Sequence, residues 1–339
     1  MNRKHFLSTI IPIAAVSTAF TGNEPNADLA FKQNIPPYLK KGDLVGIACP
    51  SGFISIEECA PAMNKMIEWG FNIRLGTTVG ARDFTFAGTD EERAKDFQQM
   101  IDDPLVKAIM LGRGGYGAVR IIDKINFKNF VKNPKWIIGF SDATVFHLHI
   151  NSNFGIATIH SKMCNSFPDD FSKADQTQID SIDSIRQCLL GNQMQYKAPA
   201  NPENRYGQGT GVLIGGNLSI IQLLCGSDSE IETKGKILFI EDVGEYLYKI
   251  DGMLWNLKRS GKLKNLKGLI VGGFRIKPDD AGEEFGKTLT EMVLEKVKEY
   301  NYPVCFDFPV GHIKENYALK CGMKHHLKVS VDGTFLECL

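Results

Sequence analysis

Short apolar runs alternate with segments of helical apolar spacing along most of the chain. The run at 44–49 is closed by a Pro-Ser-Gly turn, and helical spacing follows at 57–69. A second helical segment at 89–100, which Thr89 can cap, precedes the apolar run at 106–111. Alternating strands and helices predict an α/β fold with a parallel sheet covered by helices on both faces. Such sheets bind ligands at the carboxyl ends of their strands.

The stretch 135–148 contains the sharpest change of pattern. An apolar run ends at Gly139, Ser141 follows two residues later, and helical apolar spacing begins directly after Asp142. Gly-Phe-Ser-Asp-Ala has the spacing of a nucleophile elbow, in which small residues around the serine allow a tight strand-to-helix turn. Asp142 would then be the first residue of the helix, and its backbone N–H could stabilise an oxyanion. The alternative is that Ser141 and Asp142 form an ordinary helix N-cap pair.

A glycine-rich segment follows the apolar run at 106–111. Residues 112–117 read Gly-Arg-Gly-Gly-Tyr-Gly, and glycine lets the backbone approach a ligand closely and point N–H groups at it. No G-x-x-x-x-G-K-[ST] occurs in the chain. Phosphate binding, an oxyanion or substrate-carboxylate role, and a plain tight turn remain as alternatives.

The second half of the chain has its own series of apolar runs and glycine turns. The run at 209–217 ends in Gly-Gly-Asn, and the next one ends on the two carboxylates Glu241 and Asp242. The last long run leads into Pro-Val-Gly and then His312. The tail, 317–339, alternates in a way that predicts antiparallel strands.

Ser141, Glu241 and His312 each follow or end a predicted strand. A hydrolase triad needs a nucleophile, a base that takes its proton, and a carboxylate that holds the base in the right tautomer. These three residue types supply those roles if the fold brings them together. Taken singly, Glu241 or Asp242 could cap a helix and His312 could be a turn residue. Their joint position at strand ends favours a site.

Composition narrows the classes of partner. The chain has 339 residues, long for one domain, and its 39 Lys and Arg balance 39 Asp and Glu without a basic run, which argues against nucleic acid. Eight scattered cysteines without C-x-x-C indicate neither a zinc site nor a redox pair. Disulfides stay open, but the apolar surroundings of Cys49 and Cys305 favour buried thiols. His147 and His149 face different ways on a predicted helix and no H-E-x-x-H occurs, so no metal site is predicted.

Residues 1–22 differ from everything that follows. A positive start, a mainly apolar stretch and small residues near its end resemble a secretory signal peptide. The stretch is too short for a comfortable membrane span, so stable membrane insertion of the mature chain is not expected. The alternative is an amino-terminal segment that is disordered or docks on the core. Residues 23–40 would form a linker.

Five blocks of the chain resemble, in order, the motifs of a known enzyme family. This family is the LD-carboxypeptidases, or murein tetrapeptide carboxypeptidases, which are serine peptidases and include the microcin C immunity peptidases. The similarity runs from about residue 41 to the carboxyl terminus. The blocks are 112–117, 139–142, 215–218, 240–245 and 309–312.

The resemblance assigns roles to individual residues. It implies that Ser141 is the nucleophile and that Glu241 and His312 complete the triad, with an oxyanion hole from the N–H groups of about Gly115 and Asp142. No cofactor is implied.

Four further residues are candidates for substrate binding. A terminal carboxylate needs a cation, and Arg113 and Arg275 are candidates by position; Tyr116 and Asn217 come from the glycine motifs. Residues 160–163 depart from the glycine-proline turn of many members, so the substrate-side wall of the pocket is expected to differ.

The resemblance also implies a domain organisation. A flavodoxin-like α/β domain at 41–165 would carry the serine, and a mixed α/β domain at 210–339 would carry the glutamate and the histidine, with 166–209 as connecting segment. An α/β-hydrolase fold shares the order Ser, Glu, His, but the separate strand series after residue 209 favours two domains. A homodimer is implied as well.

The function expected from these observations is hydrolysis of the bond between an L-centre diamino acid and a terminal D-alanine in a muropeptide. Two alternatives stay open: an amidase that cleaves peptidyl-nucleotide antibiotics, and a non-catalytic binder of cell-wall peptides. A signal peptide and a murein substrate together predict export to the periplasm, although many family members act in the cytoplasm.

Overall fold

Two β-sheets carry the structure, which is a computed structural model and describes residues 34–339. The predicted signal peptide and part of the predicted linker lie outside these residues. Within the described part, the first sheet has six strands in the order β11-β5-β4-β3-β1-β2. Its strands are β1 (Leu44–Ala48), β2 (Asn72–Leu75), β3 (Val106–Leu111), β4 (Trp136–Gly139), β5 (Thr158–His160) and β11 (Leu319–Cys321).

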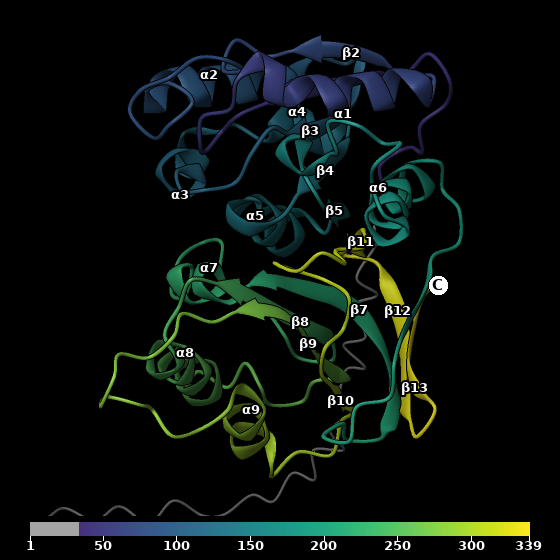
Figure 1. Ribbon diagram of the computed structural model, residues 1–339. Helices are drawn as coiled ribbons and strands as arrows, with labels where there is room; N and C mark the ends of the chain where they lie inside the picture. The colour runs from purple at the N-terminus through teal and green to yellow at the C-terminus, as the bar shows by residue number, and fades with distance from the viewer. Residues whose placement is uncertain (1–33) are drawn as a thin grey trace, which may run out of the picture. The chain divides into compact units, whose positions relative to one another are not determined.

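Strands β1 to β5 of this sheet are parallel, as the alternating pattern predicts, and β11 pairs with β5 in the antiparallel direction. Helices cover both faces, since Ile109 and Met110, neighbours on β3, belong to two different buried clusters. Figure 1 shows these helices around the strands. They are α1 (Ile56–Glu68), α2 (Asp90–Asp102), α3 (Ala118–Ile121), α4 (Lys128–Lys132), α5 (Thr144–Phe154) and α6 (Gln176–Leu189), with the 3₁₀ turns η1 (Ile122–Lys124), η2 (Ser141–Ala143) and η3 (Cys164–Ser166).

The second sheet has seven strands in the order β10-β9-β8-β7-β12-β13-β6. The tail strands β12 and β13 are antiparallel, as predicted, whereas β7, β8, β9 and β10 are parallel. The strands are β6 (Gln195–Ala198), β7 (Gly207–Asn217), β8 (Ile237–Val243), β9 (Gly268–Arg275), β10 (Val304–Cys305), β12 (Lys324–Ser330) and β13 (Gly333–Cys338). Its helices are α7 (Leu218–Leu223), α8 (Leu247–Arg259) and α9 (Leu289–Val297).

Local sequence signals explain where several helices begin. Thr89 caps α2 as predicted: its hydroxyl accepts a hydrogen bond from the Glu92 N–H, and the Glu92 carboxylate accepts one from the Thr89 N–H. Ser55 and Glu58 form the same reciprocal pair at the start of α1. Each pair satisfies two backbone donors that the helix itself leaves free.

The two sheets share buried side chains. One apolar cluster contains Ile138 and Ile159 of the first sheet together with Phe239 and Phe308 from the second half of the chain. Strand β11 adds a direct link, because it belongs to the carboxyl-terminal tail yet completes the first sheet. The predicted connecting segment contributes α6 and also β6, which pairs with β13. The fold class is therefore the predicted one, an α/β chain with a mainly parallel first sheet and a mixed second sheet.

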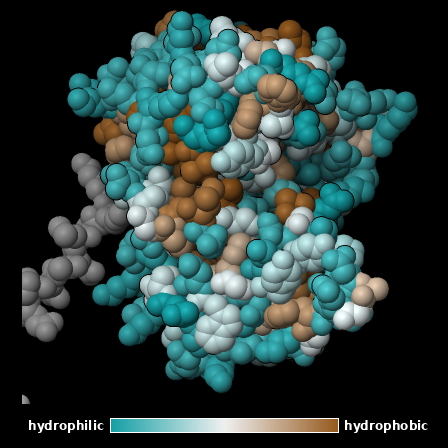
Figure 2. All heavy atoms as spheres, turned by 90° about the vertical axis from the view of Figure 1, so that its left-hand side faces the viewer, coloured by the Kyte–Doolittle hydropathy of each residue, from teal (hydrophilic) through white to brown (hydrophobic). Residues whose placement is uncertain are grey.

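All eight cysteines lie in the described residues and are free thiols, and seven of them are buried. Cys49 and Cys305 are among the buried ones, as predicted. Figure 2 shows one face of the molecule, on which apolar side chains gather at mid-height and polar ones cover most of the rest. Between residues 34 and 339 no helix is both long enough and apolar enough to cross a membrane.

Candidate active site

Ser141 occupies a sharp turn between β4 and α5. Its φ is 61°, in the left-handed region that non-glycine residues rarely adopt at a cost of about 1–3 kcal/mol. Gly139 allows this turn, because a β-carbon there would lie 3.0 Å from the Ala143 β-carbon. The N-cap interpretation of Ser141 is wrong: α5 begins after Ala143 without a side-chain cap, and no hydrogen bond within residues 34–339 uses the Ser141 hydroxyl. The predicted strand, turn and helix are present.

The glycine-rich loop lies against the serine. A β-carbon on Gly114 would be 3.2 Å from the Ser141 Oγ, and the Gly114 carbonyl accepts a hydrogen bond from the Gly52 N–H at 2.9 Å. Gly115 follows with a φ of 95°. In the described part of the chain, no hydrogen bond uses the N–H of Gly115 or of Asp142. Both N–H groups are therefore available to an acceptor beside Ser141.

Asp142 has a second role that its place in the sequence does not reveal. Its buried carboxylate accepts hydrogen bonds from the Ser51 hydroxyl at 2.5 Å and from the Ala118 N–H at 2.8 Å. Burial raises the pKa of Asp142, and the Ser51 hydrogen bond opposes that rise. The carboxylate thus ties the turn after β1 and the first residue of α3 to the serine turn.

Glu241 and His312 meet directly. Glu241 lies on β8 and is fully buried, and its Oε2 is hydrogen-bonded to the Nδ1 of His312. Burial raises the pKa of Glu241, while the bond to His312 acts in the opposite direction. A neutral imidazole that donates its Nδ1–H to a carboxylate leaves Nε2 as the acceptor of a proton. This pair can hold a general base in one tautomer.

Two hydrogen bonds from backbone N–H groups to side chains hold the turn that precedes and follows His312. The N–H of Gly311 donates to the Asn316 Oδ1 at 2.9 Å, and the Asn316 N–H donates to the Ser181 hydroxyl on α6. Asn316 is fully buried. Sequence reasoning missed this residue, because an asparagine four positions after a histidine has no distinctive local pattern.

His312 lies next to the serine turn. Its ring centroid is 4.9 Å from that of Phe140, the residue before Ser141. No hydrogen bond joins Ser141 to His312 within residues 34–339, and catalytic hydrogen bonds are often long in proteins without substrate. The structure therefore brings all three predicted triad residues into one region, with the Glu241 to His312 bond formed.

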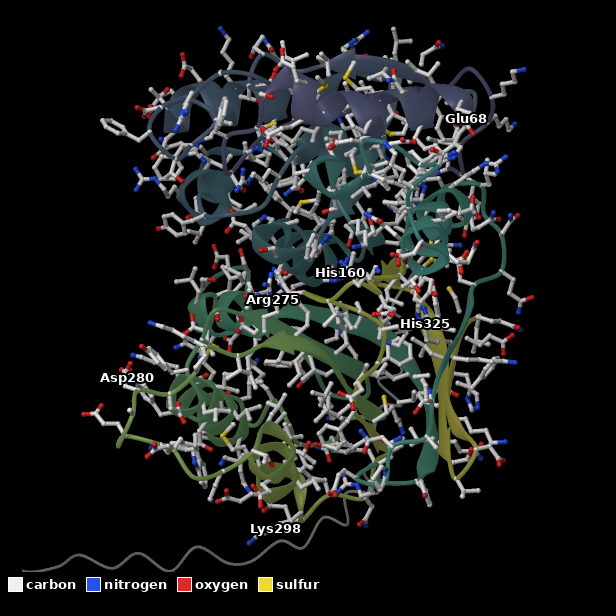
Figure 3. All side chains as sticks on the ribbon, in the orientation of Figure 1. Glu68, His160, Arg275, Asp280, Lys298 and His325 are labelled. Carbon is white, nitrogen blue, oxygen red and sulfur yellow. The ribbon has the colours of Figure 1, made fainter. Side chains whose placement is uncertain are left out.

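A pocket of about 620 Å³ opens beside His312. Arg275, an exposed residue at the end of β9, contributes to its wall, and Figure 3 places Arg275 and the buried His160 in the middle region between the two groups of strands. The pocket residues are Phe140, Arg275, Gly311, His312, Ile313, Lys314 and Glu315. Of the two predicted carboxylate-binding arginines, Arg275 is therefore the one on this pocket.

The other predicted substrate-binding residues lie elsewhere around the site. Arg113 is exposed and its guanidinium is 3.5 Å from the Phe53 carbonyl oxygen, on the glycine-loop side of Ser141. Tyr116 is half exposed, with its ring 6.2 Å from that of Phe86. Substrate binding by these residues stays a prediction.

Asn217 has a clear structural role. Its Oδ1 accepts a hydrogen bond from the Ile220 N–H and caps α7, and its Nδ2 donates to the Asp242 carboxylate. Asp242 also accepts from the N–H and the hydroxyl of Ser219 and so supports the first turn of α7. Neither Glu241 nor Asp242 is the N-cap residue of α8, the helix after β8, which begins without a side-chain cap. The Asn217 N–H donates to the Thr144 hydroxyl, which ties the end of β7 to the start of α5.

The two neighbouring histidines on α5 serve the fold. His147 is fully buried with its Nε2 2.8 Å from the Gly139 carbonyl oxygen, and burial lowers the pKa of His147 to about 4. His149 contacts the Ser229 hydroxyl through Nδ1.

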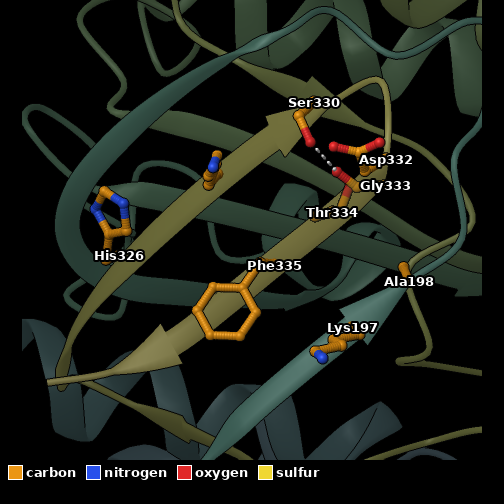
Figure 4. A pocket seen from close by; sticks show the side chains of 9 residues that line it. Lys197, Ala198, His326, Ser330, Asp332, Gly333, Thr334 and Phe335 are labelled. Atoms are coloured by element: carbon orange, nitrogen blue, oxygen red, sulfur yellow. Dashed lines mark hydrogen bonds between the residues drawn. The ribbon is translucent and has the colours of Figure 1, made fainter.

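A second hollow of about 510 Å³ lies on the β6, β12 and β13 part of the second sheet (Figure 4). Its wall includes Lys197, His326 and Phe335, and none of the predicted site residues. Of the predicted catalytic residues, His312 borders the pocket described above and none borders this second hollow.

Family models match both halves of the chain. Residues 45–161 match the LD-carboxypeptidase N-terminal domain, and residues 210–327 match the LD-carboxypeptidase C-terminal domain. A probable murein peptide carboxypeptidase of Bacillus subtilis is 32% identical over 304 residues, which cover 89% of this chain and 94% of that protein. The chain belongs to the LD-carboxypeptidase family. It is a carboxypeptidase, and the two matched segments lie within the two predicted domains.

Other members of the LD-carboxypeptidase family agree with this assignment. The murein tetrapeptide carboxypeptidase of Pseudomonas aeruginosa is 27% identical, with 82% of this chain and 91% of that protein covered. The crystal structure of a muramoyltetrapeptide carboxypeptidase from Oxalobacter formigenes superimposes with a TM-score of 0.75 at 26% identity, covering 87% of this chain and 98% of that chain. The microcin C7 self-immunity protein of Escherichia coli is 26% identical over 75% of this chain and 80% of its own length.

Proposed function

We propose that this carboxypeptidase removes the terminal D-alanine of murein tetrapeptides by cleaving its bond to an L-centre diamino acid. The hydrogen bond between Glu241 and His312, beside the strained turn of Ser141, carries the proposal. Relatives named murein peptide or murein tetrapeptide carboxypeptidase support the choice of substrate.

The proposed reaction is acyl transfer through a Ser-His-Glu triad. His312 removes the proton of the Ser141 hydroxyl through Nε2, and the serine oxygen attacks the scissile carbonyl carbon. The N–H groups of Gly115 and Asp142 stabilise the oxyanion. His312 then gives the proton to the leaving amine, D-alanine departs, and water hydrolyses the acyl-enzyme with His312 again as base. Glu241 keeps the imidazole in the productive tautomer and stabilises its charged form.

Mass spectrometry tests the proposal directly. The chain from Asn23 onward is incubated with disaccharide tetrapeptide and pentapeptide, and the same is done with Ser141→Ala and with Ser166→Ala as a matched serine control. We expect loss of one D-alanine from the tetrapeptide alone with the wild type and the control. Ser141→Ala should lower turnover by about 10⁴-fold or more, because the triad acts as a unit.

The contrary outcomes distinguish the alternatives. Full activity of Ser141→Ala refutes the proposed nucleophile. No loss of D-alanine from either peptide refutes the substrate, and release of the amino acid from an aminoacyl sulfamoyl nucleoside would then favour the antibiotic-cleaving function of the microcin immunity relatives.

Export and self-association belong to the same proposal. Murein lies outside the cytoplasmic membrane, and the signal-like pattern of residues 1–22 supports export, with action on recycled muropeptides in the cytoplasm as the alternative. Cell fractionation and amino-terminal sequencing of the mature chain test export. Sedimentation of the purified chain tests the homodimer implied by the family.

A further inference from the structure

Residues 161–165 pass beside the serine turn at the carboxyl ends of two neighbouring strands. The Ser161 N–H donates to the carbonyl oxygen of Gly139, the last residue of β4, and the Asn165 N–H donates to that of Gly112, just after β3. Between them, the Met163 methyl group lies 3.2 Å from the place of a β-carbon on Gly114. Lys162 is therefore anchored in a segment that flanks Ser141.

Lys162 is a cation without a direct partner. It is half-buried, and its ammonium group makes no hydrogen bond and no ion pair within 4.0 Å in the part of the chain that the structure describes. Burial lowers the pKa of Lys162, while the charges of Glu315 and Asp175 act in the opposite direction. A cation that has lost water and lacks a partner attracts an incoming anion more strongly than an exposed one does.

The surroundings of Lys162 connect it to the pocket. Glu315 contributes to the wall of the pocket beside His312, and Asp175 forms an ion pair with Lys314 on the same wall. By comparison, Arg113 and Arg275 are exposed to water, and Lys314 is already paired. Lys162 is thus the least exposed of these four cations, and it is unpaired.

The proposed peptide substrate carries a negative charge close to the bond that is cleaved. A carboxypeptidase acts on the last peptide bond, so the terminal carboxylate lies one residue, about 3–4 Å, beyond the scissile carbonyl. Strand β5 is the neighbour of β4, and neighbouring strands are about 4.8 Å apart. Lys162 follows the end of β5 by two residues and Ser141 follows the end of β4 by two residues, so both residues lie at the same edge of the sheet.

We propose that the Lys162 ammonium binds the α-carboxylate of the residue that the enzyme removes, and so restricts hydrolysis to peptides with a free carboxyl end. This inference rests on the proposed carboxypeptidase reaction at Ser141. It replaces the sequence-based candidates Arg113 and Arg275 in that role. It also accounts for the expected rejection of the pentapeptide, whose terminal carboxylate lies one residue further from the same bond.

Steady-state kinetics on two matched substrates test the assignment. These are the tetrapeptide with a free terminal carboxylate and the same peptide with a terminal amide. Lys162→Met removes the charge and keeps the length of the side chain, Lys162→Arg keeps the charge, and Lys173→Met removes an exposed lysine as a control. Circular dichroism and the thermal midpoint establish that each variant is folded.

We expect Lys162→Met to lower kcat/KM for the acid about 10- to 100-fold, mainly through KM, and to change kcat/KM for the amide by less than about twofold. Lys162→Arg should regain most of the preference for the acid, and Lys173→Met should keep all of it. An unchanged acid-to-amide ratio in Lys162→Met overturns the assignment. The assignment to Lys162 is also overturned if the preference for the acid over the amide disappears in Arg113→Met or Arg275→Met and persists in Lys162→Met.

Binding to the Ser141→Ala chain separates this inference from the proposed reaction. Calorimetric titration with the acid and the amide needs no turnover. If the wild type hydrolyses neither peptide, the proposed function fails, yet preferential binding of the acid that Lys162→Met abolishes still supports the Lys162 site. Equal or absent binding of both peptides refutes the site.

Discussion

Gly311 packs directly against Glu241. A β-carbon on Gly311 would lie 2.5 Å from the β-carbon of Glu241, and Gly311 has a φ of 106°, which favours glycine. This close approach places the next residue, His312, where its Nδ1 reaches the Glu241 carboxylate. The glycine is therefore a geometric requirement of the histidine and glutamate pair.

Gly311→Ala should separate that pair. The added methyl group meets a fully buried neighbour and the backbone is strained, so we expect a loss of about 2–4 kcal/mol in the free energy of unfolding together with a large fall in kcat. Gly261→Ala is the matched control, because Gly261 has a φ of 76° and open space around it. The control should cost about 1 kcal/mol and keep kcat. Urea unfolding and initial rates measure both; equal effects of the two variants would contradict the packing argument.

Glu241→Gln tests the carboxylate without changing its shape. His312 would lose the charge that stabilises its protonated form and fixes its tautomer, so kcat should fall by about 10³–10⁴-fold. Stability should stay the same or rise, since burial raises the pKa of Glu241 and makes its charge costly in the folded state. Initial rates give the change in kcat, and a thermal melt gives the change in stability. A normal kcat in Glu241→Gln would show that the Glu241 carboxylate is not part of the triad.

The buried His147 should make the protein sensitive to acid. Burial lowers its pKa from 6.5 to about 4, so the unfolded chain binds a proton near pH 6.5 that the folded chain does not bind until about pH 4. Protonation of this histidine therefore leaves the free energy of unfolding unchanged above about pH 6.5. It lowers that free energy by up to about 3 kcal/mol as the pH drops to 4.

The free energy of unfolding should depend less steeply on pH in His147→Gln than in the wild type between pH 6.5 and 4. The difference in slope corresponds to at most one proton that the unfolded wild-type chain binds and the folded one does not. The amide of the introduced glutamine can still donate to the Gly139 carbonyl oxygen. His325→Gln provides a second case, since burial also lowers the pKa of His325 to about 4. Denaturant titrations across this range give the slope, and an unchanged slope in both variants would contradict the prediction.

Asn217→Ala distinguishes a structural from a substrate-binding residue. Loss of the α7 cap and of the bond to Asp242 should cost about 1–2 kcal/mol of stability. If Asn217 only supports the fold, KM for the tetrapeptide should change by less than about twofold below the melting temperature. A rise in KM of tenfold or more in the folded variant would restore its predicted role in substrate binding.

Much of the local structure could be predicted because its causes are local. The alternation of apolar runs and helical spacing predicts the strands and helices of the first sheet, and Thr89 marks the start of α2 through a hydrogen bond to a residue three positions away. The turn at Ser141 follows from the small residues around it. The antiparallel tail follows from its alternating pattern.

Other features depend on partners that are far apart in the chain. Asn217 in a glycine motif looks like a ligand-binding residue, yet its amide is engaged by Asp242 and by α7. Strand β11 completes the first sheet from the carboxyl-terminal tail, and the Asp142 carboxylate binds Ser51 from 91 residues away. No local pattern encodes these contacts, because they result from packing two whole sheets around shared apolar clusters.

The sequence by itself therefore determined the class of fold, the type of turn at Ser141 and the set of residues able to form a triad. Spacing and side-chain chemistry act within a few residues, and they are sufficient for these conclusions. Only the tertiary structure decided that Glu241 and His312 touch, that Arg275 rather than Arg113 borders their pocket, and that Lys162 is half-buried in the segment beside the serine turn. Distances, burial and hydration depend on every element packed around a residue, and so they appear only when the whole chain is folded.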